Sequence, residues 1–532
     1  MNDNKRKNLY DEKIFNNPHD LIEIKNKEKL KLRKNKLNIE IQNKRAQKLA
    51  HINLDLETNL NSELRFKINK FEDSYIQVFN YLNSNNDELI SYALSELKVY
   101  FCFNNTNTND QKIIMENKLF ILLLNLGYKF INSKDKKNLE LILWTLNNIQ
   151  SFDKGSIEYF DILYSKEYLD FYYKSLAFGD NIDFFNLIIT IINNLIGNNY
   201  TLNNEDKNNN INFSLNLLRS PIFSLILDFL EGEENTDNQS KNILLRIIKF
   251  CVDLEDIEYS IEDNDIKIVN RCFKLLVEYA CGSNSEENLN IIYRTIFNIS
   301  NLDNKYKFNK KIIDEGITLK ILKYKFHNIK IDTNIIDIID FGLRIIANNL
   351  TISDKDCKII YDSNIIDYYN NILFAFKDNF KIARDIFTGL ANISVGSKKN
   401  LIITSSIWEE NSIQKYCNMD DEFIISYIRI ATYLTYHADY ETLKFIYKTK
   451  ILQYLIFIFT NSNIRNLIIY EKILRLINTY LEQFKDDKKE SEEFKMIFHK
   501  FIDLIQSSDK INELKCLDII KNITENIKNK YK

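Results

Sequence analysis

One motif recurs along most of this chain: an apolar, helix-like stretch closes on a polar anchor residue, and a polar turn leads into the next apolar stretch. Neighbouring anchors lie between 41 residues apart (Asn392 to Tyr433) and 55 residues apart (Asn194 to Lys249). A unit of this length cannot bury its apolar face alone, so it has to stack on its neighbours. The motif therefore predicts a long array of helical repeats, which presents an extended binding surface.

The scarcity of helix-breaking residues supports this prediction, because the chain has only 10 Gly and 2 Pro among 532 residues. Hydrophobic residues make up 45% of the sequence, enough to bury a core along most of its length. A period of about 40 to 47 residues is typical of armadillo and HEAT arrays. We therefore expect an all-α fold, a right-handed superhelical solenoid of about ten armadillo repeats over residues 75–532.

Residues 1–60 differ from the array and form a separate segment. Between residues 21 and 50, ten Lys or Arg stand against three Glu. Leu37, Ile41, Leu49 and Ile52 recur there at near-helical spacing. This pattern favours a flexible basic segment that becomes an amphipathic helix on a partner.

The composition disfavours several classes of function. The net charge is -3 and the pI is near 6.1, whereas nucleic-acid-binding domains are normally basic. The 7 Cys include no C-x-x-C pair, and the 5 His show no metal-ligand spacing. Asp340, Phe341 and Gly342 match the kinase metal-binding tripeptide, but no other kinase motif accompanies them. We expect no enzyme, no cofactor, no metal, no direct nucleic-acid partner and no membrane segment.

The basic segment resembles the importin-β-binding segment at the start of importin-α. In both, a short apolar-Glu-apolar stretch, here Ile39-Glu40-Ile41, stands between two basic clusters. The resemblance implies that importin-β wraps this helix, whereas an ordinary charged amphipathic helix is the alternative. The importin-β contacts that it implies are Lys25, Lys27, Arg33, Lys34, Lys36, Ile39, Ile41, Lys44, Arg45 and Lys48.

The array carries the second part of the resemblance. Importin-α holds basic nuclear localisation signals with Trp and Asn residues four apart on the third helix of successive repeats, a spacing that places both on one helix face. Trp144 and Asn148 are an intact copy, while Arg344 and Asn348 match a repeat in which the family also has Arg. The implied cargo contacts are Trp144, Asn148, Asn194, Asn298, Arg344, Asn348, Asp354, Asp385 and Asn392.

The resemblance implies a nuclear import adaptor that links cargo to importin-β and shuttles between cytoplasm and nucleus. Asp354 and Asp385 lead us to expect that basic cargo depends more on the sixth and seventh repeats than on Trp144. We also expect weak self-inhibition, because residues 50–53 lack the basic cluster that occupies the family's groove.

Two further points stay open at this stage. The family's export receptor is an implied partner, although residues 528–532 show no acidic patch for it. The alternative to the adaptor is an armadillo or HEAT-type scaffold that binds a non-basic peptide or a protein surface.

Overall fold

A computed structural model describes the parts of the chain considered below. These are residues 67–68, 70–103, 108–149, 162–163, 165–178, 182–199, 207–232, 238–252, 262–282, 285–302, 307–324, 333–376, 379–394, 421–437, 472–476, 478, 503, 521–522 and 524–525. Their regular secondary structure is entirely helical, which confirms the predicted all-α class for these residues. The chain divides into two compact units, Met1–Asp228 and Phe229–Lys532, and each is described by itself.

The first unit contains helices of 9 to 18 residues. They are α3 (Phe71–Leu82), α4 (Asp87–Phe103), α5 (Thr108–Glu116), α6 (Leu119–Ser133), α7 (Lys136–Ile149), α9 (Lys166–Phe178), α10 (Ile182–Asn199) and α11 (Lys207–Leu218). The boundary between the units falls inside α12 (Pro221–Glu231), which opens on the proline that suits a first helical turn.

The described part of the second unit is also built from α-helices. It contains α13 (Asn238–Val252), α14 (Asp263–Cys281), α15 (Glu286–Ser300), α17 (Phe308–Asp314), α18 (Ile317–Leu322), α19 (Thr333–Asn349), α20 (Asp354–Tyr361), α21 (Ile365–Ala375), α22 (Phe380–Ser394) and α25 (Asp421–His437).

A unit of three consecutive helices recurs along the chain. It is seen in α17, α18 and α19, again in α20, α21 and α22, and in the first unit in α5, α6 and α7. A left-handed residue turns the chain between the first two helices each time: Lys118 (φ 54°), Gly316 (φ 76°) and Asn364 (φ 55°). Gly and Asn adopt this conformation most readily. The three-helix unit is that of armadillo repeats, so the predicted repeat fold is confirmed here.

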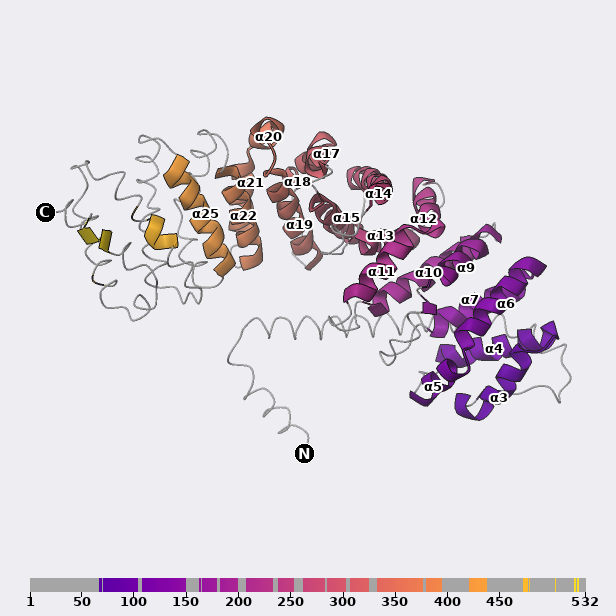
Figure 1. Ribbon diagram of the computed structural model, residues 1–532. Helices are drawn as coiled ribbons and strands as arrows, with labels where there is room; N and C mark the ends of the chain where they lie inside the picture. Colours follow the sequence, from indigo (N-terminus) through magenta and orange to yellow (C-terminus); the bar gives the residue numbers. More distant parts are fainter. Residues whose placement is uncertain are drawn as a thin grey trace. The chain divides into compact units, whose positions relative to one another are not determined.

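The third helices of successive repeats pack side by side. We call α4, α7 and α10 the first row and α13, α15, α19, α22 and α25 the second row (Figure 1). Each row helix buries an apolar stripe at a spacing of three and four residues, as Ile335, Ile338, Ile339, Leu343 and Ile346 do in α19. Each such side chain contributes about 1.5 to 3 kcal/mol of burial free energy, so the contacts between row helices stabilise each unit.

Helical glycines set the close approach between some of these helices. A Cβ on Gly127 of α6 would overlap the Phe171 ring of α9. One on Gly342 of α19 would lie 2.9 Å from Ile321 Cγ2 of α18. At these positions a larger residue would force the neighbouring side chain to shift.

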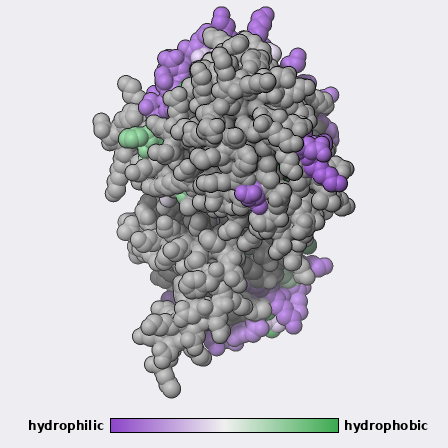
Figure 2. All heavy atoms as spheres, turned by 90° about the vertical axis from the view of Figure 1, so that its left-hand side faces the viewer, coloured by the Kyte–Doolittle hydropathy of each residue, from purple (hydrophilic) through white to green (hydrophobic). Residues whose placement is uncertain are grey.

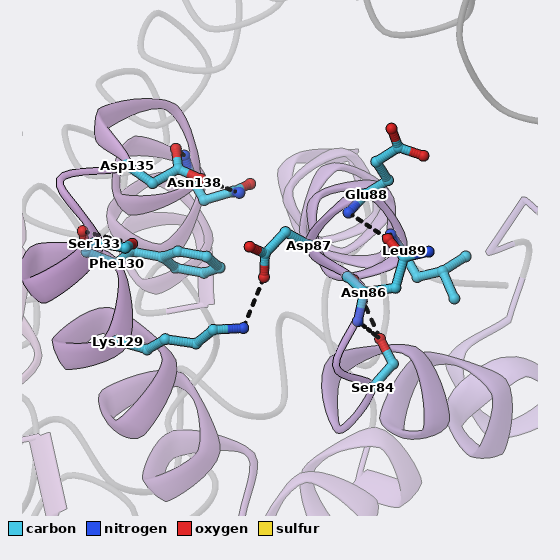
Figure 3. A network of polar contacts seen from close by, with 10 residues as sticks. All are labelled: Ser84, Asn86, Asp87, Glu88, Leu89, Lys129, Phe130, Ser133, Asp135 and Asn138. Atoms are coloured by element: carbon cyan, nitrogen blue, oxygen red, sulfur yellow. Dashed lines mark hydrogen bonds and ion pairs between the residues drawn. The ribbon is translucent and has the colours of Figure 1, made fainter.

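Polar side chains fix the starts of helices in the first unit (Figure 3). Asn86 Oδ1 accepts from the backbone N–H of Glu88 at 2.9 Å, and Asp135 Oδ1 accepts from the N–H of Asn138 at 3.1 Å. These bonds satisfy amides that a first helical turn leaves without partners. Between α6 and α4, Lys129 Nζ donates to Asp87 Oδ1 at 2.7 Å.

Few large apolar side chains of the described residues reach the surface. Ile76, Ile121, Ile359 and Phe374 are the exposed ones, and Phe374 of α21 is 86% exposed. In Figure 2, most of the described residues that are visible at the surface are hydrophilic. Among the described helices, none is both long and apolar enough to cross a membrane.

Candidate peptide-binding surface

In the first row, α7 presents an indole beside a carboxylate. Glu140, Trp144 and Asn148 lie four residues apart and therefore on one face of α7. Trp144 is half-buried, and its Nε1 donates to Glu140 Oε1 at 3.4 Å. Lys98 Nζ of α4 lies 5.6 Å from the centroid of the Trp144 ring, within the range of a cation–π contact. The indole face is thus already occupied by one ammonium group of the chain itself.

Lys98 occupies an unusual position for a lysine, because it is only 4% exposed. Burial lowers the pKa of its ammonium group, and the negative charge of Glu140 opposes that shift. Neither this lysine nor Glu140 belongs to the sequence-predicted site. Glu140 could have been found from its spacing to Trp144, whereas the approach of Lys98 is a tertiary contact between residues 46 apart.

The asparagines that were predicted as peptide ligands have a different use in the first row. Asn148 is 1% exposed, and its Nδ2 donates to the backbone oxygen of Lys98 on α4 at 2.9 Å. Asn194 of α10 is half-buried and donates to Asn147 Oδ1 of α7 at 3.0 Å. Each amide therefore ties its helix to the preceding helix of the row.

The same bond recurs in the second row. Asn348 Nδ2 of α19 donates to Ser300 Oγ at 2.7 Å and to Asn301 Oδ1 at 2.9 Å. Ser300 is the last residue of α15, and Asn301 follows it directly. Asn392 Nδ2 of α22 donates to the backbone oxygen of Ala347 on α19 at 2.7 Å. Asn298 of α15 is half-buried. The recurring asparagine is thus an inter-repeat tie, and its role as a peptide ligand stays a prediction.

Arg344 of α19 lies at the centre of a charged cluster. Its Nε lies 3.1 Å from Asp385 Oδ2 of α22 and 3.5 Å from Asp340 Oδ2 of its own helix. Lys381 Nζ lies 2.7 Å from the same Asp340 oxygen, and Arg384 Nε lies 3.5 Å from Asp385 Oδ1. The two carboxylates therefore serve internal ion pairs between α19 and α22.

This geometry bears on the expected ranking of cargo contacts, which stays a prediction. Asp385 is 7% exposed and already paired with Arg344, so an incoming basic side chain would have to displace that arginine. Asp354 begins α20, the first helix of the next repeat, and its side chain lies outside what the structure describes. Around α19 and α22, the ionic network gives a basic peptide no open carboxylate at Asp385.

The carboxyl groups of Asp340 and Asp385 have pKa values that are shifted in opposite directions. Burial, together with the neighbouring Asp340, raises the pKa of Asp385 to about 7, and Arg344 and Arg384 oppose that shift. Burial also acts to raise the pKa of Asp340, but its hydrogen bond with Asp385 and the charges of Lys381 and Arg344 hold it below its usual value. Asp385 is thus the member of the pair that takes up a proton first as the pH falls.

The predicted importin-β contacts are not placed by this structure. They all precede residue 67, outside the described residues, so they stay predictions: Lys25, Lys27, Arg33, Lys34, Lys36, Ile39, Ile41, Lys44, Arg45 and Lys48. In the part of the chain that is described, no group of three His, Cys, Asp or Glu is arranged to hold a metal ion.

Comparison with known proteins relates this chain to others by fold alone. No protein-family model matches the sequence, and no curated protein matches it. The crystal structure of an engineered protein is similar over 85% of this chain and 98% of its own, with 16% sequence identity and a TM-score of 0.59. A designed armadillo repeat protein matches over 48% of this chain and 98% of its own, with 12% identity and a TM-score of 0.34.

Proposed function

We propose that this protein is a nuclear import adaptor of the importin-α type, which binds basic localisation signals of cargo proteins and links them to importin-β. The observation that carries the proposal is the ammonium site of the first row, where Lys98 lies over the Trp144 indole and Glu140 supplies a nearby negative charge. A site that holds the chain's own ammonium group offers the chemistry that a lysine of a basic signal requires.

The proposed cargo surface extends from Trp144 to the half-buried Thr190 and Asn194 of α10. Thr190 stands where the family has a second Trp, so this surface offers one indole and not a pair. A peptide lysine would use Trp144 by taking the place of Lys98 or by lying against another part of the ring. The affinity for basic signals should therefore be lower than that of a site with two indoles.

The partner side of the proposal rests on residues 1–60. Their basic clusters are expected to bind importin-β, so the complex would carry cargo from cytoplasm to nucleus. No catalytic step and no cofactor is required by this role. Return by an export receptor is part of the same proposal.

The test measures two interactions of the full chain. A labelled basic signal peptide should bind, and Trp144→Ala should weaken its binding about thirtyfold, because a desolvated cation–π contact contributes about 2 kcal/mol. Phe374→Ala, on the exposed aromatic of α21, is the matched control and should leave affinity unchanged.

The second measurement is a pull-down of importin-β by the full chain and by a chain that lacks residues 1–60. Loss of importin-β on truncation supports the adaptor. If the truncated chain keeps every partner, or if Trp144→Ala and Phe374→Ala bind the basic peptide equally, the protein is a scaffold of another kind.

A further inference from the structure

Three cations of the second row converge on one aromatic ring. The guanidinium carbons of Arg294 and Arg344 lie 5.5 and 5.9 Å from the centroid of the Phe341 ring, and Lys381 Nζ lies 5.9 Å from it. Arg344 also lies 5.6 Å from the Phe297 ring of α15. Strong cation–π contacts occur about once per 70 to 80 residues in proteins, so this convergence on α15, α19 and α22 is a concentrated feature.

The acidic and basic side chains of this cluster differ in their exposure to solvent. The Asp340 side chain is 0% exposed and that of Asp385 is 9% exposed, whereas Lys381 is 44% and Arg344 27% exposed. The anionic groups are therefore buried between α19 and α22, and the cationic groups reach solvent. Asp337 of α19 is a further, half-buried carboxylate; burial raises its pKa, and the charges of Lys381 and Arg294 oppose that shift.

The solvent-facing side of this cluster presents cations that lie against half-buried phenylalanine rings. Phe297 and Phe341 are both half-buried. Like charges gathered around one ring repel one another. Asp340 and Asp385 relieve part of that repulsion from the buried side, and an anion on the solvent side relieves more of it. A basic peptide would add to the repulsion instead.

We propose that the face formed by Arg294, Phe297, Phe341, Arg344 and Lys381 binds an extended acidic peptide segment. The carboxylates of the peptide pair with the three cations, and its apolar side chains contact the edges of the two phenylalanine rings. A peptide fits better than a nucleic acid, because the rings already carry cations on their faces and are not open to stacked bases, and the whole chain is net negative.

This surface belongs to the second unit, whereas the proposed site for basic signals lies on the first. The two proposals fail separately: a chain that binds no basic peptide can still bind an acidic one. The probe is a short labelled peptide in which Glu alternates with Leu, measured by fluorescence anisotropy against the full chain at low and at physiological salt.

Lys381→Gln should weaken the acidic peptide about tenfold, and Lys381→Arg should retain most of the affinity. The matched control is Lys310→Gln in the same unit, because its lysine is 47% exposed and also pairs with a carboxylate. The control should bind like the unchanged protein.

A test on the peptide side avoids any effect of Lys381→Gln on folding. Replacing each Glu of the peptide by Gln leaves the protein intact and should abolish binding. The proposal is overturned if the Gln peptide binds as well, if Lys310→Gln weakens binding as much as Lys381→Gln, or if a single-stranded oligonucleotide of equal charge competes equally well.

Discussion

The first and second rows use the same repeat position for opposite chemistry. Four residues before the recurring asparagine, α7 has Trp144 beside Glu140. At the same position, α15 and α19 have Arg294 and Arg344 beside phenylalanine rings. In the first row an aromatic residue holds a cation of the neighbouring helix, and in the second the position itself is cationic. The comparison teaches that one backbone pattern can present either an ammonium site or a cationic surface.

Removal of a buried counter-ion should produce the largest difference between the rows. Asp340→Ala leaves Arg344 and Lys381 without their shared carboxylate, and breaking a buried ion pair costs about 3 to 5 kcal/mol. We expect the lower end, since Lys381 is 44% exposed and can be solvated by water.

Urea unfolding of the full chain measures this effect, with Asp356→Ala on α20 as the control because its ion pair with Lys310 is exposed. The destabilisation should be confined to the second unit. Equal effects of Asp340→Ala and Asp356→Ala would show that the buried network contributes no more than a surface pair.

Close helix packing should give the next largest effect. Gly127→Ala forces the Phe171 ring to move, and overpacking of this kind costs about 1 to 3 kcal/mol. Gly342→Ala in the second row meets a side-chain methyl of Ile321 at 2.9 Å and should cost less. Thermal unfolding of both variants gives the ranking, and a larger loss for Gly342→Ala would contradict the observed packing.

The asparagine ties should differ in strength between the rows. Asn148→Ala removes a buried hydrogen bond to the Lys98 oxygen, and the loss of such a bond costs about 0.5 to 1.5 kcal/mol. Asn348→Ala should cost less, because Asn348 is half-buried and water can replace its bonds.

The same two variants also separate the structural role from peptide binding. Stability is measured by urea unfolding, and affinity by titration with the basic peptide. If Asn148→Ala weakens the basic peptide while stability is unchanged, the sequence-based assignment as a ligand is correct and the tie is unimportant.

The effects of pH should have opposite signs in the two rows. The folded pKa of Asp385 is about 7 against 3.8 for the ordinary group, so the folded state binds more protons than the unfolded state between these values. The second unit should therefore lose stability as pH rises through this window. Asp385→Asn should remove that loss.

In the first row, the lowered pKa of Lys98 means that the folded state binds fewer protons than the unfolded state just below pH 10.5. The first unit should therefore gain stability as pH rises toward that value, and Lys98→Met should abolish the gain. Stability curves over pH check both signs.

The sequence alone determined the helical repeat class, because it depends on local properties: apolar residues at helical spacing, scarce Gly and Pro, and a recurring anchor. It also located Trp144, Asn148, Arg344 and Asn348 on the row helices, since a spacing of four residues places side chains on one face of any helix. These features need no knowledge of which helices meet.

Only the tertiary structure decided what those residues contact. Asn148 bonds to Lys98 and Asn392 to Ala347 across 50 and 45 residues, and Asp385 faces Arg344 instead of solvent. A polar residue on a helix face has the same spacing whether it points to a ligand or to the next helix. The choice depends on helix separation and burial, which are set by the packing of the whole row and are absent from the local sequence pattern.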